Sequence, residues 1–93
     1  MTEYIMINHG VGSPEKWDIY FKMLSENNHM IGGSALECGI SLKESAFSEA
    51  ISTTITGYIV IQAESLEKAK EVMEKSPIHA AGGTVELFTL VKS

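Results

Sequence analysis

The spacing of hydrophobic and polar residues alternates between strand-like and helix-like periods along the chain. The pattern is clearest in the C-terminal part. Residues 54–63 and 84–92 are rich in β-branched and aromatic residues, which is typical of strands. Between them, apolar residues recur at helical spacing after Ser65, whose hydroxyl can cap a helix start. Pro77 disfavours the α conformation at Ser76 and should end this helix. The pattern predicts a strand, a helix and a strand.

The N-terminal part repeats this order. Residues 3–8 form a short, mostly apolar stretch that predicts a strand. Ser13 and Pro14 are typical of a helix start, and the apolar spacing that follows predicts a helix ending around residues 27–28.

The middle of the chain is less regular. Residues 30–42 begin as a strand, in which Gly32 and Gly33 allow a bulge or a close backbone approach. Residues 43–52 are polar with isolated apolar positions, and they fit either a hairpin loop or a short helical turn. The chain of 93 residues is therefore expected to be one α+β domain, spanning 1–93, with the order βαββαβ. This order predicts a ferredoxin-like fold: a four-stranded antiparallel sheet with two helices on one face.

The predicted strands are apolar on both sides. In the last strand Val85 and Leu87 share one side, whereas Phe88 and Leu90 share the other. A strand with one solvated side should alternate apolar and polar residues. Because so short a chain has few elements with which to cover a second side, we expect a homodimer formed through the open sheet face.

Composition narrows the possible partners. The net charge of −5 argues against nucleic-acid binding, which requires a basic surface. The single cysteine, Cys38, cannot form an internal disulfide, which fits a reducing compartment. There is no signal-like N-terminus and no apolar run of membrane-spanning length, so we expect a cytoplasmic protein with no membrane partner.

The C-terminal third contains Glu64-Ser65-Leu66 at a helix start, then Pro77 and the pair Gly82-Gly83 before the last strand. With this order of residues it resembles the YCII-related family and its DGPF-domain relatives. The matching positions are Gly57, Glu64, Ser65, Leu66, Ala69, Pro77, Gly82, Gly83, Val85 and Glu86, and Gly32-Gly33 with Leu36 resembles the mid-chain "GG..L" element of that family. The resemblance implies a dimeric α+β barrel, in which two ferredoxin-like sheets pack face to face. That implication agrees with the dimer predicted from the strand patterning.

The sequence also departs from this family. No Asp-Gly-Pro-Phe motif occurs between Leu42 and Thr56, where the DGPF relatives carry it. A His–Asp pair is sometimes proposed as catalytic in the family, but this chain has a single aspartate, Asp18, placed in the first helix. The pair therefore cannot be transferred to this chain.

His79 and Glu86 are the candidate catalytic residues. His79 follows Pro77 in a loop, and an imidazole is suited to proton transfer near neutral pH. Glu86 lies inside a strand on a mostly apolar side, where a carboxylate must be paired, raised in pKa or placed in a cavity. The alternatives are that His79 bonds to the preceding helix end, and that Glu86 forms a structural ion pair or a dimer contact.

A ligand site is expected in a cleft between sheet and helices. Its candidate residues are Trp17, Tyr20, Tyr58, Phe88 and Ser34. Trp17 and Tyr20 equally fit a core stripe of the first helix. His9 and His29 are expected to face solvent, and Cys38 fits a small buried residue of a strand rather than a nucleophile.

No metal-ligand spacing and no dinucleotide fingerprint occurs, so neither a metal nor a cofactor is expected. The chain is interpreted as a homodimer that binds or transforms a small, apolar organic molecule. The alternative is a non-catalytic protein-interaction or accessory dimerisation domain. The sequence does not decide whether the protein is an enzyme.

Overall fold

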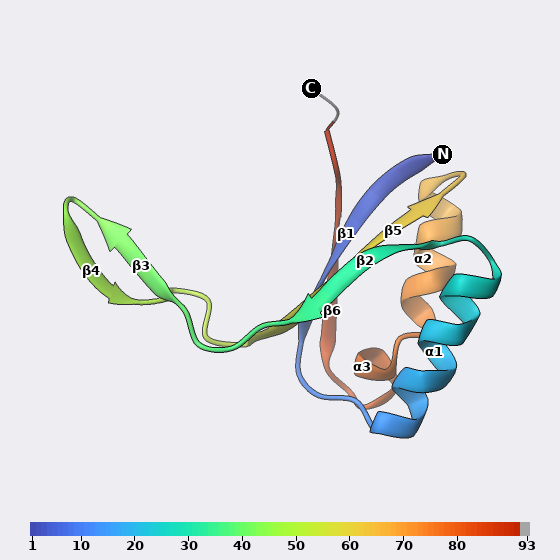
Figure 1. Ribbon diagram of the computed structural model, residues 1–93, viewed down its shortest axis with the longest axis horizontal. Helices are drawn as coiled ribbons and strands as arrows, with labels where there is room; N and C mark the ends of the chain where they lie inside the picture. Colours follow the sequence, from blue (N-terminus) through green and yellow to red (C-terminus); the bar gives the residue numbers. More distant parts are fainter. Residues whose placement is uncertain (92–93) are drawn as a thin grey trace.

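An antiparallel sheet forms the centre of the protein. A computed structural model describes residues 1–91 (Figure 1). The sheet has four strands in the order β2-β5-β1-β6. These are β1 (Thr2–His9), β2 (Met30–Ala35), β5 (Ile55–Ala63) and β6 (Thr84–Thr89). All three neighbouring pairs are antiparallel.

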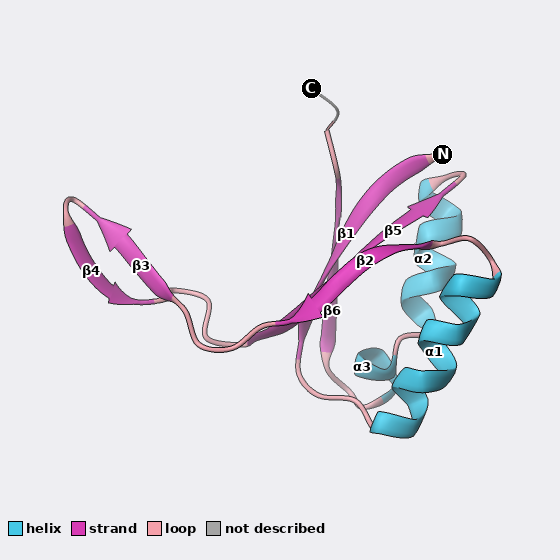
Figure 2. Ribbon diagram, in the orientation of Figure 1, coloured by secondary structure: helices cyan, strands magenta, loops and turns pink. Residues whose placement is uncertain are grey.

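Helices cover one face of this sheet (Figure 2). They are α1 (Pro14–Glu26), α2 (Leu66–Glu74) and the short α3 (Pro77–Ala80). Ser13, Ser65 and Ser76 cap their N-termini by accepting backbone N–H bonds. The sequence did not predict α3. Pro77 ends α2 as expected, but it also suits the first position of a new helical turn.

The core lies between the sheet and α1 and α2. Alternate residues of the central strands point toward the helices, and Met6 and Ile61 are fully buried there against Leu24 and Val72. The predicted α+β arrangement is confirmed: the sheet is antiparallel and the helices lie on one side of it. This topology is consistent with a ferredoxin-like fold. The last strand was predicted to reach Lys92, but β6 ends at Thr89 and Lys92 lies outside the described residues.

The opposite side of the sheet is here called the open face. No helix of the described chain covers it (Figure 1). Its side chains are mostly apolar and come from β1, β5 and β6: Ile5, Ile7, Tyr58, Val60 and Phe88. Phe88 is 52% exposed. The predicted apolar character on both sides of the sheet is therefore present.

The four-stranded sheet and its helices are here called the body. A β-hairpin leaves the body between β2 and β5 and extends away from it (Figure 1). We call residues 36–54 the arm. It holds β3 (Ile40–Lys43) and β4 (Ala46–Glu49), which form a separate two-stranded sheet. Glu44 and Ser45 both have positive φ, as a two-residue type I′ turn requires. Of the two alternatives for residues 43–52, the hairpin is therefore the observed one.

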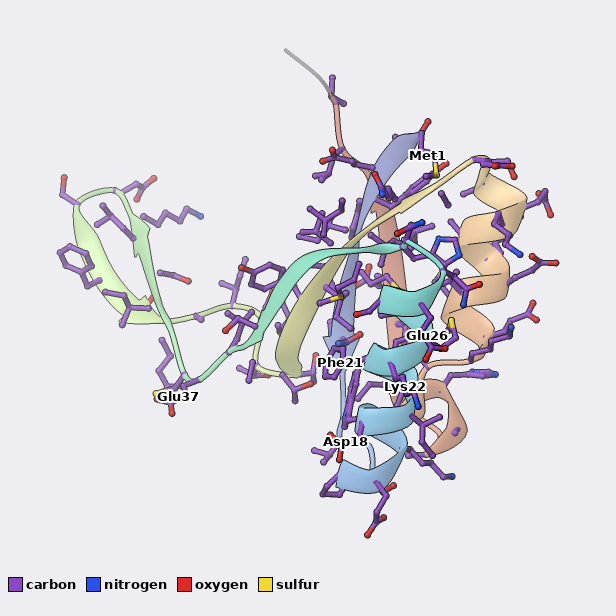
Figure 3. All side chains as sticks on the ribbon, turned by 45° about the vertical axis from the view of Figure 1, so that its right-hand side comes forward. Met1, Asp18, Phe21, Lys22, Glu26 and Glu37 are labelled. Atoms are coloured by element: carbon purple, nitrogen blue, oxygen red, sulfur yellow. The ribbon has the colours of Figure 1, made fainter. Side chains whose placement is uncertain are left out.

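The arm corrects two expectations. Cys38 was expected to lie in the second strand and to be buried, but β2 ends at Ala35. Cys38 is exposed, and Figure 3 shows Glu37 at the base of the arm, away from the helices. Gly39 follows them and interrupts the strand pattern before β3 begins.

Candidate functional site

A cavity of about 470 Å³ opens between α1 and the β2–β5 side of the sheet. Trp17 and Phe21 of α1 form one wall, and Ile78 of α3 and the loop after β1 form another. The remaining lining comes from β1, β2 and β5: Asn8, Met30, Gly33, Ser34, Ala35, Thr56, Gly57, Tyr58 and Ile59. Its volume falls within the range of small-molecule sites, about 300–1,000 Å³.

The cavity exists because the sheet carries little bulk at this point. The inward positions of β2 and β5 here are Gly33, Ala35 and Gly57, as their register with the buried Ile59 shows. A side chain at Gly33 would bring its Cβ within 2.6 Å of the Tyr58 carbonyl oxygen. The close pairing of β2 with β5 therefore requires glycine at Gly33, and the space opposite α1 stays empty.

The aromatic wall is made by neighbouring turns of α1. The rings of Trp17 and Phe21 stack with centroids 5.3 Å apart, and Phe21 is 39% exposed at the surface. Tyr20 meets Trp17 edge-on but points into the core, where its hydroxyl donates to the Val72 carbonyl at 2.8 Å. Burial raises the pKa of the Tyr20 hydroxyl, since the phenolate would be desolvated. Tyr20 therefore supports the wall from behind and does not line the cavity.

Asn8 is the buried polar side chain of the cavity. It follows Tyr4 and Met6 at inward positions of β1 and is only 4% exposed. Its Oδ1 atom has no hydrogen-bond partner among residues 1–91. The nearby Thr56 hydroxyl does not supply one, because it donates to the Gly10 carbonyl at 2.6 Å. A buried polar atom without a partner is costly, and this one adjoins a cavity.

The structure separates the predicted site residues into groups. Trp17, Ser34 and Tyr58 border the cavity. By register, Ser34 and Tyr58 are outward positions of β2 and β5, so their side chains belong to the open face. Phe88 and Glu86 lie on the open face, opposite Ile5 and Ile7 of β1. His79 is exposed in α3 and is not part of the cavity lining. His79 and Glu86 are thus not placed together at this cavity.

Glu86 is instead paired with His9. The His9 Nε2 atom lies 2.6 Å from Glu86 Oε1, and the His9 Nδ1 atom lies 2.8 Å from Thr54 Oγ1. With Glu86 ionised, Nε2–H donates to the carboxylate and Nδ1 of a neutral imidazole accepts from the Thr54 hydroxyl. This arrangement joins a hydroxyl, an imidazole and a carboxylate, the groups that move a proton in acid–base catalysis. His9, expected to face solvent, is held by both ring nitrogens.

His29 also departs from the expectation. It is 8% exposed, and its Nδ1–H donates to the Gln62 carbonyl at 2.8 Å. It therefore fastens the start of β2 to β5 rather than facing solvent.

Among residues 1–91, no group of three or more His, Cys, Asp or Glu side chains is placed to hold a metal ion. Within the same residues, no helix has the length and apolar character needed to cross a membrane.

Sequence reasoning missed Asn8, Phe21, Met30 and Thr56 as lining residues. Asn8 had a usable signal: a polar residue at an inward position of an apolar strand is expected to have a partner or a role. The glycine pair Gly32-Gly33 was a second signal, since close backbone approach was one of its two readings.

Comparison with solved structures supports the fold. The chain is similar to the 5-chloro-2-hydroxyhydroquinone dehydrochlorinase TftG from Burkholderia phenoliruptrix AC1100, whose structure is a complex with 2,5-dihydroxybenzoquinone. The TM-score is 0.57 at 12% identity, over 98% of this chain and 95% of that one. At this identity the similarity shows a shared fold. No family model and no curated protein matches the sequence, so membership of the YCII-related family stays a prediction.

Proposed function

We propose that this protein binds a small organic molecule in the cavity between α1 and the sheet, and that it works as a homodimer. The observation that carries the first part is the cavity itself, about 470 Å³ with largely apolar walls and one buried amide. Binding sites for small molecules combine these features: mostly hydrophobic and aromatic walls with few polar groups.

The lining favours binding over acid–base chemistry inside the cavity. The lining side chains of the described chain include no carboxylate, imidazole, amine or thiol. The His9–Glu86 pair, which carries such groups, belongs to the open face. The similar structure TftG is an enzyme bound to a small cyclic molecule, which supports a small-molecule ligand without assigning a reaction to this chain.

The homodimer is supported by the open face. Its half-buried and exposed apolar side chains form a contiguous layer across β1, β5 and β6. An antiparallel sheet normally has one covered side and one polar side, and this sheet has apolar residues on both. A second copy would cover the open face, in agreement with the dimer predicted from the sequence.

The binding proposal is tested with 2-naphthol as the probe and Ala35→Phe as the blocking variant. Ala35 lies at an inward position of β2 and lines the cavity, so a phenyl ring there would fill the space. We expect 2-naphthol to shift backbone amide signals around Gly33 and Gly57 in ¹H–¹⁵N spectra of the wild type. Ala35→Phe should weaken binding by about 10-fold or more, because the ring occupies the volume of the ligand.

The matched control is Ala46→Phe, the same substitution at an exposed position of the arm that does not line the cavity. It should bind 2-naphthol as the wild type does. Signals that shift elsewhere in the chain, or equal binding by both variants, would contradict the cavity as the site.

A second candidate function is that of a protein-interaction domain. The observation that favours it is the arm, whose Leu42 and Phe47 are 61% and 70% exposed. Large exposed apolar side chains mark interaction surfaces. A chain that stays monomeric, leaves the cavity empty and binds a different protein through the arm would establish this function instead.

A further inference from the structure

We propose that Asn8 selects the ligand, and that the cavity takes uncharged, flat molecules carrying an O–H or N–H group that donates to Asn8 Oδ1. This inference rests on the proposed function, because it names the ligand class of the same cavity. It is carried by the position of Asn8, by its unpartnered oxygen and by the character of the surrounding walls.

Asn8 occupies a position that packing alone would give to an apolar residue. It continues the inward row of Tyr4 and Met6 on β1, and its side chain is almost completely buried. An isolated amide at such a position destabilises the fold unless its polar atoms are bonded. The protein nevertheless leaves Oδ1 without a partner among residues 1–91.

The neighbouring polar side chains do not supply a hydrogen bond to Asn8 Oδ1. Thr56 also lines the cavity, but its hydroxyl donates to the carbonyls of Gly10, at 2.6 Å, and Asn8, at 3.3 Å. The Ser34 hydroxyl donates to the Ala35 carbonyl at 2.9 Å. The hydroxyls of Thr56 and Ser34 therefore donate to backbone oxygens and not to Asn8 Oδ1. Among the side chains that line the cavity, the buried acceptor without a partner in residues 1–91 is the amide oxygen of Asn8.

The walls exclude charged ligands. No ionised side chain of the described chain lines the cavity, so a carboxylate, phosphate or ammonium group would be desolvated without a counter-charge. Shape adds a further restriction. Gly33 and Gly57 leave bare backbone on the sheet side, and Trp17 and Phe21 stand on the helix side. A flat apolar ring system fits between two such surfaces, with its donor group turned toward Asn8.

Replacing Asn8 with leucine separates this role from a structural one. Leucine has nearly the same shape as asparagine but carries no acceptor. If Asn8 serves a ligand, Asn8→Leu should raise the melting temperature of the free protein, because an unpartnered buried amide is removed. The same variant should lose affinity for donor-bearing ligands only. If Asn8 stabilises the fold, Asn8→Leu should lower the melting temperature.

The test uses three neutral probes with the full chain: 2-naphthol, which carries a donor, and naphthalene and 2-methoxynaphthalene, which do not. One donor-free probe is smaller and the other larger than 2-naphthol, so size effects cancel in the comparison. We expect the wild type to bind 2-naphthol about 10-fold more tightly than either donor-free probe, as one hydrogen bond to a buried acceptor allows. In Asn8→Leu this preference should disappear while the donor-free probes keep their affinity.

The possible results are distinguishable. If the three probes bind the wild type equally and Ala35→Phe blocks them all, the cavity is a binding site but Asn8 does not select the ligand. If Asn8→Leu still prefers 2-naphthol, then Asn8 likewise does not select the ligand. If no probe binds the wild type, the proposed function fails, and this inference fails with it. Because the wild-type preference is measured without any variant, the test stands even if Asn8→Leu folds poorly.

Discussion

The body and the arm follow the same alternation rule with opposite outcomes. In the body, Met6 and Ile61 alternate with outward residues and are completely buried under the helices. In the arm, Ile40, Leu42 and Phe47 share one side of the hairpin, because Leu42 pairs with Phe47 and Ile40 pairs with Glu49. Ser41 and Ser48 share the other side. The arm is thus amphipathic, yet its apolar side is exposed.

This difference shows what a hydrophobic pattern specifies. It specifies which side of a strand requires cover, but the cover must come from another element. For the body it comes from α1 and α2, whereas no element of the described chain packs on the apolar side of the arm (Figure 1). A lone two-stranded hairpin is marginally stable in water. The arm and the open face are therefore two uncovered apolar regions of one chain, and both would be covered in the proposed homodimer.

The largest effect is expected from removing the arm. Replacing residues 37–52 by a short glycine-containing turn should leave the body folded, because no core residue is removed. We expect self-association to weaken by about 100-fold or more, since large apolar contacts carry most interface energy. Sedimentation equilibrium over a range of concentrations measures this. A truncated chain that associates as strongly as the intact one would show that the arm contributes nothing to the dimer.

A smaller effect is expected when alanine substitutions in the body and in the arm are compared by their loss of unfolding free energy. Leu24→Ala in the body should lower the free energy of unfolding by about 2–5 kcal/mol, because it leaves a cavity in a fully buried core. Phe47→Ala in the arm should change the unfolding free energy of the monomer by less than about 0.5 kcal/mol. Denaturant unfolding at low protein concentration provides both values. Equal losses would indicate that the arm is packed in the monomer.

The smallest effect concerns pH and the body alone. Burial raises the pKa of Tyr20 above its unfolded value of about 10, so the fold favours the neutral phenol. This stabilisation is fully present below pH of about 10 and is lost as the pH rises toward the folded-state pKa. The wild type should therefore lose stability above that pH. Tyr20→Phe should lose less over the same interval, although it lacks the hydroxyl bond to Val72. Parallel pH-dependent curves for the two proteins would contradict this assignment.

Most of the fold was predictable from the sequence because the four sheet strands, α1 and α2 carry local periodicity. The inward row of β1, the capped starts of the helices and the strand after Thr54 all carry short-range signals. The sequence did not distinguish a hairpin loop from a short helical turn at residues 43–52, because these residues are too polar to show a clear period. The helix α3 was missed because a proline was interpreted only as an end.

The site was less predictable, for physical reasons. The His9–Glu86 pair joins residues 77 positions apart, and only the register of β1 with β6 brings them together. The cavity depends on small residues at inward positions, and a glycine pair indicates a close backbone approach without marking a ligand site. Trp17, Ser34 and Tyr58 were expected in a cleft between sheet and helices and do border the cavity, but their role in binding a ligand stays a prediction. The catalytic roles predicted for His79 and Glu86 stay predictions.

The backbone is closed at the base of the arm, where the Leu36 amide donates to the Thr56 carbonyl at 2.9 Å. Ala35 and Thr56, which line the cavity, lie just inside this closure. Insertions, deletions or replacements beyond it can be absorbed without changing the register of β2 and β5. The arm is therefore a segment whose length and surface evolution or a protein engineer can change while the cavity is inherited unchanged.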